Sequence, residues 1–157
     1  MKLYFIRHGK AGYDAPTDEA RPLTPEGIQQ AKNNGALFDK MGIIPTAIYT
    51  SPRLRAQQTA QYIGDALDIA PQIDEACNFD FTAQKALHIA QNHTPDDILF
   101  FVGHNPSMSE VVTTLTGAQV DLSTCAVAYV KNSMSAPSQR ATLKWLITAK
   151  MVAAMLE

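Results

Sequence analysis

The sequence is poor in the features that mark specialised structural classes. It contains two cysteines, Cys77 and Cys125, which lack the paired spacing of a zinc site or a thioredoxin-like redox motif. We therefore expect two unbridged thiols. The formal net charge is only −2, so no general attraction to nucleic acid or to an anionic membrane is expected. Any site for an anion must be local.

Long apolar runs are also missing. The first apolar segment, Leu3 to Ile6, is interrupted by Arg7 and is too short for the core of a signal peptide. No other run approaches the length needed to span a bilayer. Together with the unpaired cysteines, this favours a cytoplasmic protein.

The chain has the size and composition of one ordinary domain. It has 157 residues, of which 46% are hydrophobic and 18% are charged, and it shows no repeats or linkers. A chain of this length can bury one substantial core without disulfides or metal. We predict a single domain over residues 1–157.

Predicted strands and helices alternate along the chain. Three short apolar segments rich in aromatic and branched residues are predicted to be buried strands, at 2–6, 47–50 and 98–102. Helices are predicted over 24–41, from Ser51-Pro52 to 67, over 82–93, from Asn105-Pro106 to 116 and over 149–156. Two further strands, 126–131 and 141–147, are predicted to form a hairpin around 132–140. This order predicts an α/β fold, a three-layer sandwich of a mostly parallel sheet with helices on both faces and an antiparallel edge.

Basic side chains follow all three of the first strands. The first strand runs into Arg7-His8-Gly9, the second into the segment Ser51 to Arg55, and the third into Gly103-His104-Asn105-Pro106. If the strands are parallel neighbours, two imidazoles and two or three guanidiniums meet at one edge of the sheet, where ligands of such folds bind. The N-termini of the following helices add positive dipole ends. This arrangement predicts an anion pocket, and phosphate is the obvious anion.

Other interpretations of these residues are less favoured. A metal site is disfavoured because arginines without nearby carboxylates would repel a cation, so we expect neither metal nor cofactor. A lone histidine after a strand is usually structural, but two in matching positions are not easily explained that way. His88 and His93 are interpreted as solvated or core-edge residues, and Ser51 as a helix cap. Periodicity alone does not decide whether Arg53 or Arg55 points inward, and Arg53 fits a solvated position.

Four blocks of the sequence resemble those of the histidine phosphatase superfamily, also called the phosphoglycerate-mutase-like superfamily. Arg7-His8-Gly9 resembles its signature, in which the histidine is transiently phosphorylated. The other blocks are Leu23-Thr24-Pro25-Glu26-Gly27 with Gln30-Ala31, Ser51-Pro52-Arg53-Leu54-Arg55-Ala56 with Gln58-Thr59-Ala60, and Gly103-His104-Asn105-Pro106. The resemblance selects Arg55 as the phosphate-binding arginine and makes His104 the second imidazole of the pocket.

Within that superfamily the chain is similar to the small bacterial phosphohistidine phosphatases of the SixA type. The similarity rests on the short length and on Arg21-Pro22-Leu23-Thr24 before the first helix. The brief region from Pro71 to Asp97 leaves little chain to roof the pocket. We therefore expect an open site that admits a phosphoryl group carried by a protein.

The resemblance implies a role for each residue of the pocket. His8 must be neutral to attack phosphorus, and the charges of Arg7 and Arg55 disfavour its protonated form. Arg7, Arg55 and a protonated His104 would stabilise the charge of the phosphoryl group during its transfer. Gly9 would let the backbone approach the phosphate closely.

Two carboxyl groups are candidates for the general acid. In the wider family a glutamate after the second helix protonates the leaving group, and Ile73-Asp74-Glu75 resembles the start of that block without its glycine-rich continuation. Asp18, in the loop before Arg21, is the other candidate. An imidazole leaves more readily than an alkoxide, so a phosphohistidine substrate has less need of an acid.

The leading functional hypothesis is therefore a metal-independent phosphatase acting on phosphohistidine of a phosphotransfer protein. One alternative is a phosphatase or mutase for small phosphate esters. Another is a binding module that holds a phosphorylated ligand without reacting with it, although such a module has no need of a histidine at position 8.

Overall fold

The protein is built on one mixed sheet of six strands in the order β3-β2-β4-β1-β5-β6. The computed structural model describes residues 1–133 and 140–157. β2, β3, β4 and β1 run parallel to one another, whereas β5 pairs with β1, and with β6 on its other side, in antiparallel fashion. The strands are β1 Lys2–Arg7, β2 Ala47–Thr50, β3 Gln72–Ile73, β4 Ile98–Gly103, β5 Val127–Lys131 and β6 Thr142–Ile147.

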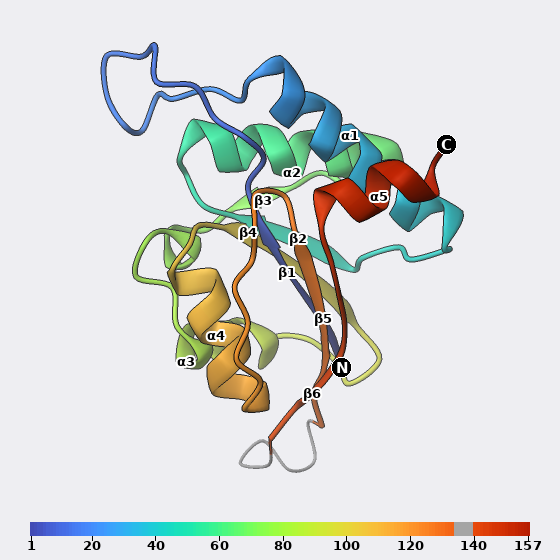
Figure 1. Cartoon of the computed structure of the whole chain (residues 1–157). Helices are drawn as coiled ribbons and strands as arrows, with labels where there is room; N and C mark the ends of the chain where they lie inside the picture. The colour runs from blue at the N-terminus through green and yellow to red at the C-terminus, as the bar shows by residue number, and fades with distance from the viewer. Residues whose placement is uncertain (134–139) are drawn as a thin grey trace.

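Helices cover both faces of the sheet, which confirms the predicted fold class. Helices α1, α2 and α5 lie on one face, and α3 and α4 lie on the other (Figure 1). A short 3-10 helix, η1, follows β3. The helices are α1 Pro25–Lys40, α2 Leu54–Leu67, η1 Glu75–Cys77, α3 Ala83–Ala90, α4 Ser107–Thr116 and α5 Ala149–Met155.

The core lies in two layers because successive side chains of a strand point to opposite faces. In β1, Phe5 belongs to the layer under α3 and α4, where its ring stacks on Phe101 with 5.4 Å between centroids. The neighbouring Tyr4 belongs to the opposite layer and packs edge-on against Phe38 of α1. The central strands are thus buried on both sides, as expected for a parallel sheet.

Two predicted helix starts are wrong by one to three residues. α2 begins at Leu54 rather than at Ser51-Pro52, because the backbone of Arg53 is extended, with φ −70° and ψ 137°. α4 begins at Ser107, with Pro106 as the residue before its first turn.

One helix end and one strand also differ from the prediction. α3 ends at Ala90, three residues before the predicted end. The two-residue strand β3 was not predicted, since so short a segment carries no periodicity.

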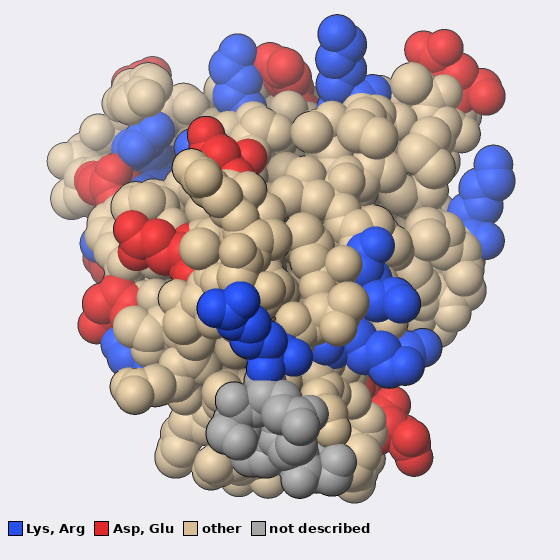
Figure 2. Space-filling model, turned by 60° about the horizontal axis from the view of Figure 1, so that its bottom comes forward, with Lys and Arg blue, Asp and Glu red and all other residues tan. Residues whose placement is uncertain are grey.

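The remaining predictions about the scaffold are largely confirmed. β5 and β6 are antiparallel neighbours, although most of the predicted connection at 132–140 lies outside the described residues. Cys77 and Cys125 are both free and buried. No helix within the described ranges has the length and apolar character needed to cross a membrane. Acidic and basic side chains are interspersed over the face shown in Figure 2.

Candidate active site

The sheet brings the predicted site residues together at one edge. β1, β4 and β2 are adjacent and parallel, in register up to their carboxyl ends. The next residue along the chain is His8 after β1, His104 after β4 and Ser51 after β2. The rings of the two histidines lie 5.2 Å apart between centroids. The expectation that these strands are parallel neighbours is therefore confirmed.

Both ring nitrogens of His8 have a partner. Nδ1 lies 2.7 Å from the backbone oxygen of Gly9, which can only accept a hydrogen bond, so Nδ1 carries the proton of the neutral ring. Nε2 then has a free electron pair and accepts a hydrogen bond from Nε of Arg55 at 3.3 Å. Only 9% of the residue is exposed. The geometry fixes the ring with its unprotonated nitrogen towards a guanidinium.

The surroundings of His8 favour its neutral form. Burial lowers its pKa to about 4, although the hydrogen bond to the Gly9 carbonyl acts in the opposite direction. The positive charges of Arg55, Arg7 and Arg21 lower the pKa further. Loss of hydration is thus a larger cause than the arginine charges considered from the sequence.

His104 is more deeply buried than His8 and is also neutral in this state. Nε2 lies 2.7 Å from Oγ of Ser51, whereas Nδ1 is buried and has no hydrogen-bond partner among the described residues. Burial, followed by the charges of His8 and Arg55, lowers its pKa to about 3. This neutral ring differs from the protonated His104 that was expected to stabilise the phosphoryl group, and its protonation during transfer stays a prediction. The role of Ser51 also differs from the prediction, because α2 has no side-chain cap. The hydroxyl of Ser51 contacts His104 and accepts a hydrogen bond from the N–H of Arg53 at 3.2 Å, just ahead of the helix.

Arg55 and Asp18 lie over His8. Besides its contact with His8, Arg55 donates from Nη1 to the backbone oxygen of Asp18 at 2.8 Å and from Nη2 to Oδ2 of Asp18 at 3.2 Å. The side chain of Arg55 is only 4% exposed, whereas that of Asp18 is 47% exposed. The nitrogen that would attack phosphorus is thus hydrogen bonded to Arg55, which in turn pairs with Asp18. The open site expected from the brief region between Pro71 and Asp97 stays a prediction.

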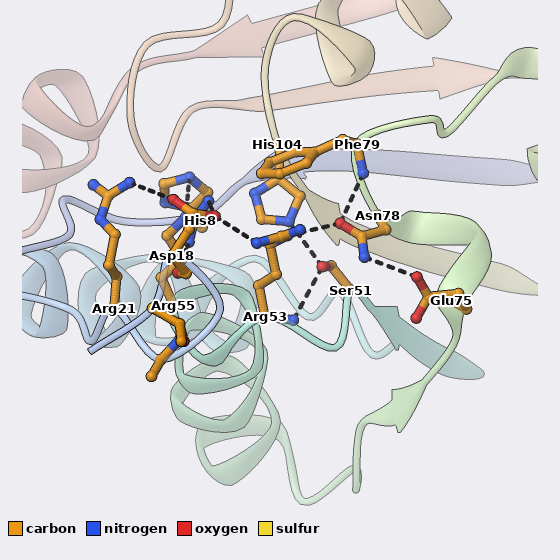
Figure 3. A network of polar contacts seen from close by, with 12 residues as sticks. His8, Asp18, Arg21, Ser51, Arg53, Arg55, Glu75, Asn78, Phe79 and His104 are labelled. Atoms are coloured by element: carbon orange, nitrogen blue, oxygen red, sulfur yellow. Dashed lines mark hydrogen bonds and ion pairs between the residues drawn. The ribbon is translucent and has the colours of Figure 1, made fainter. Parts of the chain in front are cut away.

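Asp18 is the centre of an arginine cluster that Figure 3 shows from close by. Its Oδ1 lies 3.0 Å from Nη1 of Arg21, and its Oδ2 also pairs with Nη1 of Arg53. Burial alone would raise the pKa of Asp18, but hydrogen bonds and charge from Arg21, Arg55 and Arg53 outweigh that effect and lower it. Asp18 is consequently ionised at neutral pH and carries no proton to donate.

Gly9 connects the site to the helices of one face. Its N–H donates to Oγ1 of Thr59 at 3.0 Å, and Thr59 in turn donates to the backbone oxygen of Arg55. A Cβ atom on Gly9 would lie 2.7 Å from the backbone oxygen of Gly27. The backbone of Gly9 therefore lies close to the backbone of α1. The sequence-based argument considered only its approach to phosphate.

The guanidinium of Arg7 is held by the segment after α4. Its Nη1 donates to the backbone oxygen of Leu122 at 3.0 Å, and its Nε is buried without a partner in the part of the chain that the structure describes. Arg7 also lines a surface groove of about 610 Å³ together with Asn105 and Asp121. The Nε of Arg7 is thus a buried donor that no described residue satisfies.

Glu75 lies away from His8, at the far end of the same network (Figure 3). Its Oε1 accepts a hydrogen bond from Nδ2 of Asn78 at 2.8 Å, and Oδ1 of Asn78 accepts one from Nε of Arg53 at 2.9 Å. The guanidinium of Arg53 lies 4.0 Å from the ring centre of Phe79. Neither Asn78 nor Phe79 was predicted from the sequence, and Arg53 is partly buried in the network rather than freely solvated.

The other two histidines lie outside this network. His88 is exposed on α3. His93 follows that helix and bonds to the hydroxyl of Tyr49 at 2.6 Å and to Asp97 at 3.0 Å, so it connects β2 to the turn before β4. A structural role for His93 agrees with its interpretation as a core-edge residue. No group of three or more His, Cys, Asp or Glu side chains within residues 1–133 and 140–157 could hold a metal ion.

Comparisons with known proteins agree with this geometry. The family model of the histidine phosphatase superfamily (branch 1) matches residues 3–78. An uncharacterised protein of Picosynechococcus sp. is 36% identical over 115 residues, 70% of each chain. Phosphohistidine phosphatase SixA of Escherichia coli is 33% identical over 69 residues, which are 44% of this chain and 43% of SixA.

Solved structures share the fold over nearly the whole length. The protein histidine phosphatase SixA complexed with tungstate covers 100% of both chains with a TM-score of 0.85 and 23% identity. Phosphoserine phosphatase from Entamoeba histolytica, in complex with 3-phosphoglyceric acid, covers 96% of this chain and 98% of its own with a TM-score of 0.72 and 20% identity.

Proposed function

This chain belongs to the histidine phosphatase superfamily, and we propose that it is a phosphatase whose nucleophile is Nε2 of His8. The observation that carries the proposal is the state of that ring. The Gly9 carbonyl holds the proton on Nδ1, and the free electron pair of Nε2 faces the cationic group of Arg55. An imidazole prepared in this way can attack an electrophile that an arginine holds.

In the first step, Nε2 of His8 attacks phosphorus, and the bond from phosphorus to the leaving nitrogen breaks with its electron pair. The leaving imidazole departs as a neutral ring because its other nitrogen is protonated before the step. Arg55 and Arg7, whose Nε has no partner among the described residues, would bind the phosphoryl oxygens. His104 would add a neutral donor, because Ser51 can give its hydroxyl proton to Nε2 and leave the proton of His104 on the unpartnered Nδ1. In the second step, water attacks phosphorus, His8 leaves as the neutral ring, and inorganic phosphate is released.

The substrate that we propose is phosphohistidine on a phosphotransfer protein. The charges around Asp18 keep it ionised, and Glu75 is engaged with Asn78, so neither carboxyl is placed as a ready proton donor in this state. A leaving imidazole has less need of such a donor than an alkoxide does. The match to phosphohistidine phosphatase SixA supports the same choice.

The proposal is tested by phosphate release from a phosphorylated histidine-phosphotransfer domain. We expect the wild-type protein to release phosphate and His8→Ala to release none above the spontaneous rate. Equal release by the two proteins would reject the proposal. A preference for small phosphate esters over the phosphoprotein would instead favour the ester phosphatase considered above, and tight phosphate binding without turnover would favour a binding module.

A further inference from the structure

One carboxylate is held by three guanidiniums at the entrance to the site. Oδ1 of Asp18 lies 3.0 Å from Arg21, and its Oδ2 pairs with both Arg53 and Arg55. Guanidiniums hold planar two-oxygen groups of this kind with directed hydrogen bonds. The entrance therefore contains an anion-binding arrangement, and a side chain of the protein itself occupies it.

Arg53 is held in place independently of Asp18. Its guanidinium stacks on the ring of Phe79, and its Nε donates to Oδ1 of Asn78, which Glu75 fixes through a second hydrogen bond. Phe79 is 49% exposed and belongs to neither main core layer. Its ring contacts are with His104, Arg53 and Arg55. This aromatic residue thus supports the site rather than the core.

Arg21 is also held by groups other than Asp18. Its Nε donates to the backbone oxygen of Gly12 at 2.9 Å, and its guanidinium lies 4.1 Å from the ring centre of Tyr13. Both Arg21 and Arg53 would therefore keep their positions if Asp18 moved away. A pair of fixed cations is prepared to receive another anion.

These two arginines lie further from the nucleophile than Arg55 does. Arg55 is 4% exposed and contacts His8 directly, whereas the side chains of Arg21 and Arg53 are 19% and 17% exposed and meet at the half-exposed Asp18. Ion pairs with an exposed partner contribute little free energy. A stronger or better placed anion can therefore displace Asp18.

We infer that Arg21 and Arg53 form a second anion subsite at the entrance, which binds a carboxylate of the substrate after Asp18 has left. A carboxylate is the class of ligand because that group fits there now, with one oxygen towards each arginine. Arg55 is left free to bind the phosphoryl group. The inference rests on the proposed phosphatase activity and adds an acidic group close to the phosphorylated residue as a determinant of specificity.

Two small substrates that differ in one charge test the subsite. N-acetylphosphohistidine has a free carboxylate, and its carboxamide has none. We expect wild-type protein to prefer the carboxylate in kcat/KM by about fivefold to tenfold, the scale of one ordinary hydrogen bond in a protein. In Arg53→Gln the preference should disappear through loss of activity on the carboxylate alone. Lys85→Gln removes the same charge on α3, where Lys85 pairs with Asp80, and should keep the preference.

Inhibition by inorganic phosphate separates this subsite from the phosphoryl site. Arg55→Gln should weaken phosphate inhibition strongly, and Arg53→Gln should change it by less than about twofold. Any one of three results would overturn the inference. The first is equal kcat/KM of wild-type protein for the two substrates, and the second is an equal loss of activity on both substrates in Arg53→Gln. The third is equal weakening of phosphate inhibition by Arg53→Gln and Arg55→Gln. Release of phosphate from the phosphorylated phosphotransfer domain tests the proposed function separately, so its failure there is distinct from failure of the subsite. Wild-type protein that is active on that domain but inactive on both small compounds would also overturn the inference.

Discussion

At the scale of single residues, Asp18 was a candidate for the general acid, but its position opposes substrate binding. Its carboxylate engages Arg55, so an incoming phosphoryl group must compete with it. We expect Asp18→Asn to bind inorganic phosphate about fivefold more tightly, because the substitution removes the competing ion pair with Arg55 and such a partly exposed pair amounts to about 1 kcal/mol. Competitive inhibition by phosphate measures this change.

Asp80→Asn is the matched control, since Asp80 is an exposed aspartate paired with Lys85 away from the site. It should leave phosphate inhibition unchanged. Weaker phosphate binding by Asp18→Asn would show instead that Asp18 serves to orient the arginines.

The two buried imidazoles predict a dependence of stability on pH. Burial lowers the pKa of His8 to about 4 and that of His104 to about 3, below the usual value of about 6.5 expected in the unfolded chain. Below that value the unfolded state takes up protons that the folded state does not, so the free energy of unfolding falls with acidification. Between pH 7 and pH 5 the loss is on the order of 2 kcal/mol for each imidazole.

Urea unfolding at the two pH values measures this loss. His8→Gln should reduce the difference between pH 7 and pH 5, whereas His88→Gln, on the exposed part of α3, should not. An identical pH dependence in His8→Gln and wild type would contradict the burial argument.

Much of the site could be predicted from residue types at strand ends. His8 and His104 could be placed there because each follows a buried apolar strand, whereas Arg55 was chosen over Arg53 by the family resemblance. Arg53 and Phe79 could not, since their positions depend on a stack between segments 26 residues apart in the sequence. The neutral state of His104 was missed for a related reason, because the degree of burial is a property of the packed structure.

At the scale of elements, the contact between the loop after β1 and the start of α1 positions the nucleophile. A Cβ atom on Gly27 would lie 2.1 Å from the backbone oxygen of Lys10, and no side-chain rotation can relieve that contact. We expect Gly27→Ala to lose about 1–3 kcal/mol of stability, as overpacked sites do. It should also lower kcat, because the displaced loop carries the Gly9 carbonyl that holds His8.

Gly12→Ala in the same loop is the control. A Cβ atom there would lie 3.9 Å from its nearest neighbours, an ordinary contact. Thermal unfolding and phosphatase rates of the two variants make the comparison. A Gly27→Ala protein as stable and active as Gly12→Ala would contradict the proposed role of this contact.

Helix starts were predicted well where local capping signals decide them, and less well where the capping residue also has a partner in the site. Thr24 caps α1 as predicted, with its Oγ1 accepting from the Gly27 N–H at 3.1 Å. Ser51 has the residue type of a cap, but its hydroxyl faces His104 and the helix begins later. Cap signals in the sequence do not reveal such competition from a partner 53 residues away.

At the scale of the whole molecule, replacing a phenylalanine by alanine should cost more stability in the core layers of the sheet than in the site. Phe101 is fully buried in β4 and stacks on Phe5, whereas Phe79 is 49% exposed. We expect Phe101→Ala to cost about 3–5 kcal/mol of stability and Phe79→Ala less than about 1 kcal/mol. Chemical denaturation measures both.

Activity should follow a different order for these two variants. At a temperature where both are folded, Phe79→Ala should lose more activity on substrates with a free carboxylate than Phe101→Ala does, because it releases Arg53. A large loss of stability in Phe79→Ala would place this residue in the core and contradict the assignment.

The fold class followed from the alternation of strands and helices, but the strand order did not. That order places β4 between β1 and β2, although β4 comes after both in the chain. This arrangement brings His8, Ser51 and His104 into one site. Sequence spacing cannot determine it, because long connections allow several orders.

The central claim is that His8 receives the phosphoryl group, and trapping that intermediate tests it most directly. Wild-type protein is mixed with a phosphorylated histidine-phosphotransfer domain, quenched in alkaline denaturant that preserves phosphohistidine, and mapped by peptide mass spectrometry. We predict one phosphoryl group on the peptide containing His8, and none in His8→Asn. Phosphate release by the wild type with no phosphoryl group on His8, or with the group on another residue, would contradict the account.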